Sequence, residues 1–152
     1  MSFFSLVVYP STAGSNMPLV SIETVHKCLH CKKVIKIPKM REHIGGHIIR
    51  GEVDCFSCGF CGGSTGCSIS LRKTTHKIRV PESNCSMFKK FSLTSAQTST
   101  ANTPCTNRPV DCQICKVVYW SYAMQKHYEQ KHVDSPCPEL IAEEEKAIMK
   151  VK

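Results

Sequence analysis

The stretch CLHCKKVIKIPKMREHIGGH, residues 28–47, combines two cysteines and two histidines at the spacing of a metal site. Two residues separate Cys28 from Cys31, and three separate His43 from His47. A C-x2-C turn brings two thiolates together, and histidines four positions apart on a helix project from one face toward the same ion. The stretch therefore predicts a tetrahedral site that holds one metal ion.

The same pattern returns 84 residues later in CQICKVVYWSYAMQKHYEQKH, residues 112–132. Its candidate ligands are Cys112, Cys115, His127 and His132, with four residues rather than three between the histidines. Units of this size bury too little apolar surface to fold unaided, so we expect each of them to fold around its metal. The repeat predicts two metal-dependent units in one chain.

Both stretches resemble the CCHH zinc-finger family, whose ββα unit has a core residue four positions after the second cysteine and another three before the first histidine. Those positions hold Ile35 and Met40 in the first stretch, and Tyr119 and Met124 in the last. The resemblance implies zinc as the cofactor. Both stretches have 11 residues between the cysteine and histidine pairs, where the family most often has 12.

In that family, bases are contacted from positions one, four and seven before the first zinc histidine. By the resemblance, these positions are Glu42, Lys39 and Lys36, then Lys126, Ala123 and Trp120. Lysine can donate to guanine and glutamate can accept from cytosine. We therefore expect nucleic-acid contacts at Lys36, Lys39, Glu42 and Lys126; Ala123 lacks a hydrogen-bonding side chain, and Trp120 is equally suited to packing or to a partner.

The middle segment offers more cysteines than one further site needs. Cys58 and Cys61, in CGFCG, form the most convincing pair because the glycine after the second cysteine allows a tight turn. We expect Cys85 and Cys105 to complete a zinc site with them. The alternative ligands are Cys67, which is the close competitor, Cys55 and His76.

Cys55, Cys58 and Cys61 also follow the C-x2-C-x2-C start of an iron–sulfur motif, but the x3-C-P continuation is missing. The CGFCG stretch, PCTNRP at residues 104–109 and the last Cys/His stretch with Trp120 resemble multi-finger proteins of fungi over roughly residues 28–133. That resemblance implies a multi-finger architecture and brings no activity with it.

The predicted fold is a small metal-stabilised α+β structure, with two ββα zinc fingers flanking a cysteine-rich β-hairpin zinc module and a C-terminal amphipathic helix. The expected segments are a flexible arm at 1–25, fingers at 26–50 and 110–133, the middle module at 52–109 and the tail helix within 134–152, from Glu139 onward. The hairpin strands are expected at Ser68–Leu71 and Lys77–Val80, and an exposed loop at Thr94–Thr103.

The net charge of +8 is concentrated in two blocks. Residues 26–52 carry seven Lys/Arg against two Glu, and residues 53–110 carry seven against two acidic residues. A basic surplus on metal modules favours binding to nucleic acid, most simply to DNA in a regulatory or chromatin-associated role. The 64 residues between His47 and Cys112, however, exclude a simple phased pair of fingers.

Two other functions fit the same sequence. Trp120, Tyr122, Tyr128 and the tail helix would suit a protein-interaction adaptor, because aromatic side chains anchor interfaces. The same aromatic residues beside lysines would also suit RNA binding by stacking. Local packing within the finger is an equally good explanation of the three aromatic side chains.

Other classes of protein are disfavoured by what the sequence lacks. The cysteine count of 11 is odd, and there is no secretory signal pattern and no apolar run of membrane-spanning length, so we expect the nucleus or, alternatively, the cytoplasm. No metalloprotease, deaminase or phosphate-loop motif is present. Four-ligand zinc sites leave no open position for a substrate, so we expect neither an enzyme nor a small-molecule substrate. Because no apolar run has membrane-spanning length, we expect no membrane partner either.

Overall fold

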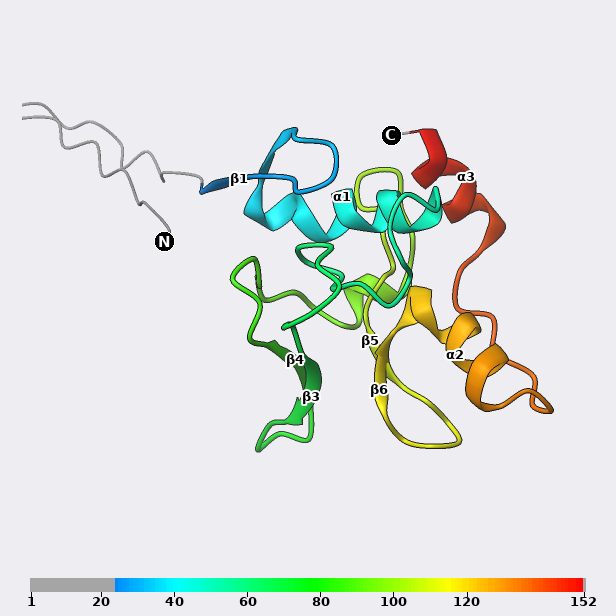
Figure 1. Ribbon diagram of the computed structural model, residues 1–152. Helices are drawn as coiled ribbons and strands as arrows, with labels where there is room; N and C mark the ends of the chain where they lie inside the picture. Colours follow the sequence, from blue (N-terminus) through cyan, green and yellow to red (C-terminus); the bar gives the residue numbers. More distant parts are fainter. Residues whose placement is uncertain (1–23, 152) are drawn as a thin grey trace, which may run out of the picture.

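Each outer Cys/His stretch forms a pair of short antiparallel strands followed by a helix in the computed structural model, which describes residues 24–151 (Figure 1). The elements are β1 (Val25–Lys27), β2 (Val34–Lys36), α1 (Ile37–Ile49), β3 (Ile69–Lys73), β4 (Arg79–Ser83), β5 (Pro109–Asp111), β6 (Val118–Trp120), α2 (Met124–Lys131) and α3 (Glu143–Val151), with two 3-10 turns, η1 (Ser95–Gln97) and η2 (Ser121–Ala123). Apart from its last two residues, the arm expected at 1–25 lies outside the described residues.

The first unit, residues 25–50, consists of β1, β2 and α1. β1 pairs with β2 in the register Val25↔Lys36, and α1 follows β2 without a loop. Pro38 lies in the first turn of α1, where its missing N–H costs no intrahelical bond. The predicted order of hairpin and helix is therefore present.

The last unit, residues 109–132, repeats this order with β5, β6, η2 and α2. β5 pairs with β6 in the register Pro109↔Trp120. The predicted core positions of both units are filled: Met40 and Met124 are buried, and Ile35 and Tyr119 pack beside them half-buried.

The middle segment contains the expected hairpin, with its strands one to two residues further along the chain than predicted at most ends. β3 and β4 pair from Ile69↔Ser83 to Lys73↔Arg79. β3 lies beside the β5–β6 pair (Figure 1). The Arg79 guanidinium forms an ion pair with the Asp111 carboxylate. The expected loop at 94–103 is mostly exposed, but η1 buries Ala96.

The C-terminal helix α3 begins at Glu143, later than the sequence suggested. Three glutamates occupy its first turn and Lys150 its last, which is the favourable order for the helix dipole. α3 lies against α1 (Figure 1). Met149 of α3 is fully buried in the cluster that also contains Ile44 of α1. None of the helices in the described part of the chain is long and apolar enough to span a membrane.

The units share one interior. A Cβ added at Gly45 of α1 would lie 2.8 Å from Cys105 Sγ and 3.3 Å from the Tyr122 ring, so the first unit approaches the middle segment and η2 at backbone distance. Phe60 of the middle segment packs edge-on against Trp120 of the last unit, with ring centroids 5.0 Å apart. The outer Cys/His stretches and the middle segment are therefore parts of one body.

Candidate metal centres

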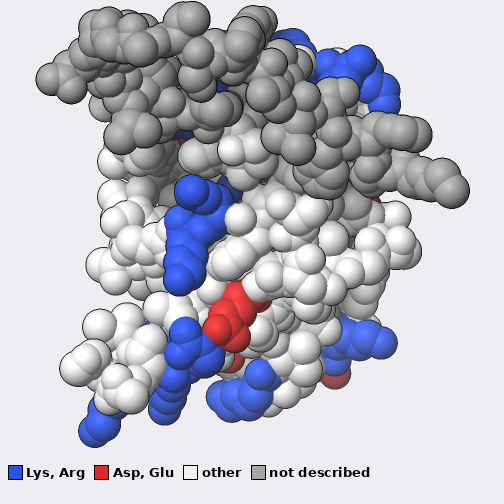
Figure 2. Space-filling model, turned by 90° about the vertical axis from the view of Figure 1, so that its left-hand side faces the viewer, with Lys and Arg blue, Asp and Glu red and all other residues white. Residues whose placement is uncertain are grey.

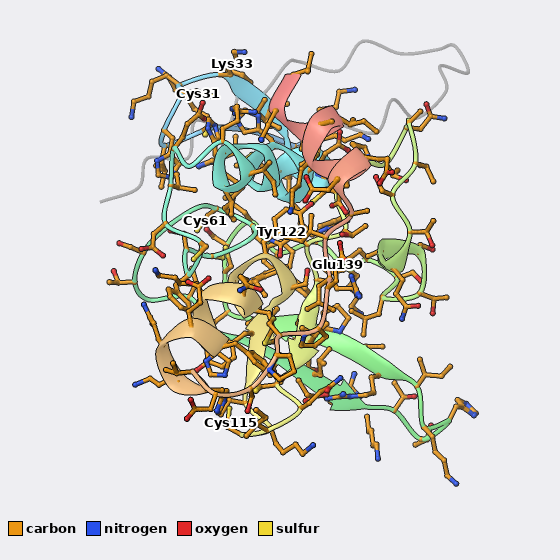
Figure 3. The ribbon with its side chains drawn as sticks, turned by 90° about the vertical axis from the view of Figure 1, so that its right-hand side faces the viewer. Cys31, Lys33, Cys61, Cys115, Tyr122 and Glu139 are labelled. Atoms are coloured by element: carbon orange, nitrogen blue, oxygen red, sulfur yellow. The ribbon has the colours of Figure 1, made fainter. Side chains whose placement is uncertain are left out.

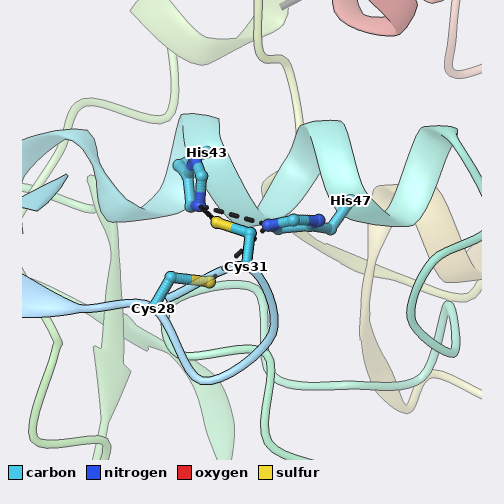
Figure 4. Close-up of side chains that lie close together, drawn as sticks. All are labelled: Cys28, Cys31, His43 and His47. Atoms are coloured by element: carbon cyan, nitrogen blue, oxygen red, sulfur yellow. Dashed lines mark hydrogen bonds between the residues drawn. The ribbon is translucent and has the colours of Figure 1, made fainter. Parts of the chain in front are cut away.

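Four side chains of the first unit converge on one point (Figure 4). Cys31 Sγ lies 3.2 Å from His43 Nε2, Cys28 Sγ lies 3.6 Å from His47 Nε2, and the two Nε2 atoms are 3.1 Å apart. Tetrahedral zinc with its usual bond lengths would place sulfur and nitrogen about 3.6 Å apart and two nitrogens about 3.3 Å apart. The donor atoms thus already stand near the corners of a metal tetrahedron.

Glu52 fixes the orientation of His47. Its carboxylate forms a short contact with His47 Nδ1 and accepts hydrogen bonds from Arg50 Nε and Nη2 at 2.8 and 2.9 Å. A proton on Nδ1 leaves the Nε2 lone pair directed at the site, as in many metal-bound histidines. The hydrogen bonds from Arg50 and His47 lower the pKa of Glu52 to about 2.

The neighbouring ligand His43 is in the form that a metal requires. Burial, followed by the adjacent His47, lowers the pKa of the His43 imidazole. The ring is therefore neutral at neutral pH, and its nitrogen lone pair is available to a cation.

The last unit forms a second group from Cys112, Cys115, His127 and His132. Cys115 Sγ lies 3.4 Å from His127 Nε2, and burial lowers the pKa of His127. Two histidines five positions apart on a continuous helix would point about 140° away from each other. Here α2 ends at Lys131, and His132 leaves helical geometry with φ −136° and ψ 48°, which lets its ring turn back.

One atom of this group lacks any hydrogen-bond partner. His132 Nε2 is buried, and no donor or acceptor among the described residues reaches it. An unpaired buried nitrogen is costly, and a metal ion at the centre of the group would satisfy its lone pair. This orphaned atom is therefore an independent sign that a cation belongs there.

The third group is made of four cysteines: Cys58, Cys61, Cys67 and Cys85. The Sγ atoms of Cys61 and Cys67 are 3.7 Å apart, close to the edge of about 3.8 Å that tetrahedral zinc thiolates would have. The backbone N–H groups of Gly63 and Met87 donate to Cys61 Sγ and Cys85 Sγ. Such N–H···S bonds stabilise thiolates and support them as ligands.

Cys105, which we expected in this group, is replaced by its close competitor Cys67. The register Ile69↔Ser83 places Cys67 and Cys85 opposite each other, two residues beyond the open end of the hairpin. The side chain of Asn84 joins the two ends by accepting from Ser68 N (2.7 Å) and donating to Gly66 O (3.0 Å).

Cys105 instead lies buried between the first unit and η2. Its Sγ is 3.7 Å from Tyr122 Oη and 3.6 Å from Arg41 Nη1. Cysteines at both ends of a hairpin were the signal in the sequence that points to this group, because antiparallel pairing brings such positions together.

The other alternative ligands do not join any of the three groups. Cys55 is half-buried between two parts of the core, and His76 is exposed in the β3–β4 turn. Because Cys55 stands outside the group that contains Cys58 and Cys61, the C-x2-C-x2-C run does not supply three ligands to one centre. The motif that suggested an iron–sulfur cluster is therefore not used as a unit in this structure.

The C-x2-C turns of the three groups have the same backbone geometry. The residue after the second cysteine has a positive φ in each turn: 63° at Lys32, 73° at Gly62 and 62° at Lys116. In each turn the N–H of the first cysteine also donates to the carbonyl five residues later, at 2.8–2.9 Å. Figure 3 shows one cysteine of each turn, Cys31, Cys61 and Cys115, at successive levels of the molecule.

The positions that the resemblance aligned with base contacts are exposed in the first unit and mostly buried in the last. Lys36 and Lys39 of the first unit are exposed, and Lys39 Nζ lies 3.4 Å from the Glu42 carboxylate. In the last unit, Trp120 is only 6% exposed and Ala123 only 1%, so both face the core. Lys126 is exposed and pairs with Glu129 at 3.6 Å.

Burial also removes the aromatic surface considered for a protein partner, because Tyr122 and Tyr128 are as deeply buried as Trp120. Their role in the structure is packing. No family model, curated protein or solved structure matches this chain, so the interpretation of the site rests on its own residues.

Proposed function

We propose that this chain is a zinc-binding protein in which three structural ions hold one body together, and that this body binds nucleic acid. Zinc is the ion that suits the donors best, because tetrahedral thiolate and imidazole sets without carboxylates are typical of structural zinc. Ligation contributes on the order of 10–16 kcal/mol in small zinc modules.

The proposed role of the ions is structural. Each group offers four protein donors within 4.8 Å of one another, which fills a tetrahedral coordination shell. Zinc that activates water or a carbonyl needs an open position. We therefore propose a binding protein rather than an enzyme.

The observation that carries the proposal of nucleic-acid binding is the cationic surface of the first unit and the hairpin. The exposed lysines of the first unit are Lys27, Lys32, Lys33, Lys36 and Lys39. The two glutamates of this block both have basic partners: Glu42 pairs with Lys39, and Glu52 with Arg50. Figure 2 shows further Lys and Arg side chains, with little acidic surface, on the side of the molecule that carries β3 and β4.

Burial in the last unit limits where we propose that nucleic acid is bound. Trp120 and Ala123 occupy two of its three base-reading positions and pack into the core. We therefore do not propose that the two units read adjacent base triplets. Contact should concentrate on the first unit and the middle segment.

The test is a titration of the zinc-loaded full chain with single-stranded and duplex oligonucleotides at several salt concentrations. We expect binding that weakens steeply as salt rises, because counterions are released from the phosphates. The double variant Lys36→Gln/Lys39→Gln should bind more weakly, and the matched variant Lys131→Gln/Lys150→Gln, on α2 and α3, should not. Absence of binding to every oligonucleotide at low salt would overturn the proposal.

A further inference from the structure

An open groove runs along the β3–β4 hairpin. It has a volume of about 770 Å3, within the range of ligand sites in proteins. One wall is formed by alternate residues along β3 and successive residues along β4, and the other by the segment that follows Cys85. The lining includes Ser70, Arg72, Glu82, Phe88, Lys90 and Phe91.

The two faces of the hairpin have different surroundings. Arg72 and Ser70 lie on one face with their cross-strand partners Val80 and Glu82, and this face lines the groove. Ile69 lies on the other face and packs into the core cluster that contains Trp120. Because side chains alternate along a strand, packing one face onto the last unit leaves the other face open to a ligand.

Two aromatic rings are held in the opposite wall. Phe88 and Phe91 are both half-buried, and each meets the buried Phe60 ring edge-on, with centroids 5.2 and 6.2 Å apart. The Arg41 guanidinium covers Phe91 at 4.4 Å from the ring centroid. The rings are thus fixed from inside while part of their surface remains accessible from the groove.

The charge of the groove is complementary to a polyanion. Arg72 and Lys90 line it, and Lys89 is exposed beside it. Glu82 is the one acidic side chain of the lining and forms an ion pair with Arg72 at 2.5 Å. Cations beside aromatic rings are the combination that binds single strands, with phosphates on the cations and bases stacked on the rings.

Pro81 argues against a protein strand as the occupant. A peptide that extends a sheet needs free N–H and C=O groups along the outer edge of the last strand. Pro81 lies in the middle of β4, opposite Leu71, and has no N–H to offer. The edge beside the groove is therefore poorly suited to strand addition.

We propose that this groove binds single-stranded nucleic acid, with Arg72 and Lys90 on phosphates and Phe88 and Phe91 stacked on bases. The inference rests on the proposed function and specifies which nucleic acid is bound and where. Duplex DNA does not fit this arrangement, because its bases are already stacked on each other and their faces are not exposed.

The first experiment measures the affinity of the zinc-loaded full chain for a single-stranded oligonucleotide of about ten nucleotides. The variant Arg72→Gln/Lys90→Gln should bind about fivefold or more weakly, with the salt slope reduced by about 1.4 for two lost phosphate contacts. The variant Lys131→Gln/Lys150→Gln carries the same loss of charge elsewhere and should leave the affinity unchanged. An equal effect of both variants would overturn the inference.

The second experiment tests stacking. An abasic strand of equal length keeps the phosphates but lacks bases, and it should bind roughly tenfold more weakly than the intact strand. Phe88→Leu keeps most of the apolar volume but removes one aromatic ring, so it should reduce the difference in affinity between the intact and the abasic strand. Native mass spectrometry of this variant should still show three zinc ions. Equal binding of intact and abasic strands, or tighter binding of the matching duplex, would overturn the inference while leaving the proposed function standing. Failure to bind any nucleic acid would overturn both.

Discussion

At the residue scale, the metal-binding turns place lysine where glycine is usually favoured. Lys32 and Lys116 have positive φ, and each folds its Nζ back onto a carbonyl inside its own turn, Leu29 O at 2.5 Å and Gln113 O at 2.6 Å. These bonds offset part of the cost of the left-handed conformation. Of the three positive-φ positions in these turns, Gly62 is the one where a side chain would clash, because a Cβ there would lie 2.7 Å from His30 Nε2.

The corrected ligand set of the middle site gives the first prediction. Replacing Cys67 by serine removes a thiolate from the four-cysteine group, so we expect the zinc count to fall from three to two. Cys105→Ser changes a buried cysteine outside the group and should retain three ions. Native mass spectrometry of both variants measures this directly, and the reverse pattern would restore Cys105 as the ligand.

Glu52 gives the second prediction. Glu52→Gln weakens the hydrogen bond that orients His47, and loss of such outer-shell partners typically lowers metal affinity by about 10–100-fold. The exposed pair of Lys126 and Glu129 provides the control, because Glu129→Gln changes the charge equally without contacting a ligand. Chelator competition monitored with Co2+ should show a weakened first site in Glu52→Gln alone; similar curves for the two variants would contradict this role.

At the scale of elements, α3 joins the core through Met149 and Glu145, while Ile148 and Val151 remain exposed. The buried Glu145 carboxylate accepts from Thr106 N at 2.8 Å, from Thr106 Oγ1 and from Tyr122 Oη. Burial and the negative groups around it raise the pKa of Tyr122, so its hydroxyl stays protonated and donates. Arg50, which donates to Glu52, also donates to Met149 O at 3.2 Å. The end of α3 is therefore connected to the hydrogen bonds around the first site.

Truncation of α3's buried side chain gives the third prediction. Met149→Ala should lower the free energy of unfolding by about 2–5 kcal/mol, because it opens a cavity between α1 and α3. Val151, in the same helix, is 87% exposed, and its replacement by alanine should change stability by less than about 0.5 kcal/mol. Denaturant unfolding of the zinc-loaded variants measures both; equal stabilities would mean that α3 does not contribute to the core.

Local patterns in the sequence identified the elements but not all their contacts. The spacing of Cys28, Cys31, His43 and His47 is a local property, so the first ligand set could be predicted. The choice between Cys67 and Cys105 depended on the register of the hairpin. The register Ile69↔Ser83 places Cys67 opposite Cys85, and the strand bounds predicted from the sequence did not specify that register. The docking of α3 depends on the buried Glu145, whose partners are 23 and 39 residues away in the sequence.

At the scale of the whole molecule, neighbouring candidate metal centres are joined by direct contacts. His30, inside the first C-x2-C turn, donates from Nε2 to Gly62 O of the middle turn at 3.0 Å. Trp120 of the last unit packs in the same cluster as Cys58 and Cys85. The sequence suggested separate modules because each ligand set is local, whereas these contacts form only after folding.

This shared interior gives the fourth prediction. Cys112→Ser should weaken zinc retention at the two intact sites as well as its own, since loss of the last unit exposes the Trp120 cluster. Chelator competition followed by native mass spectrometry would show zinc leaving all three sites at lower chelator concentration than in the parent protein. Independent modules would behave differently, losing one ion and holding the other two with unchanged affinity.

The most direct test of the three proposed metal centres is the mass, under native conditions, of the full chain as purified. We expect three zinc ions per chain, with protons displaced from the cysteine thiols as the thiolates bind. Two ions or fewer on the intact sequence, or iron in place of zinc, would contradict the assignment.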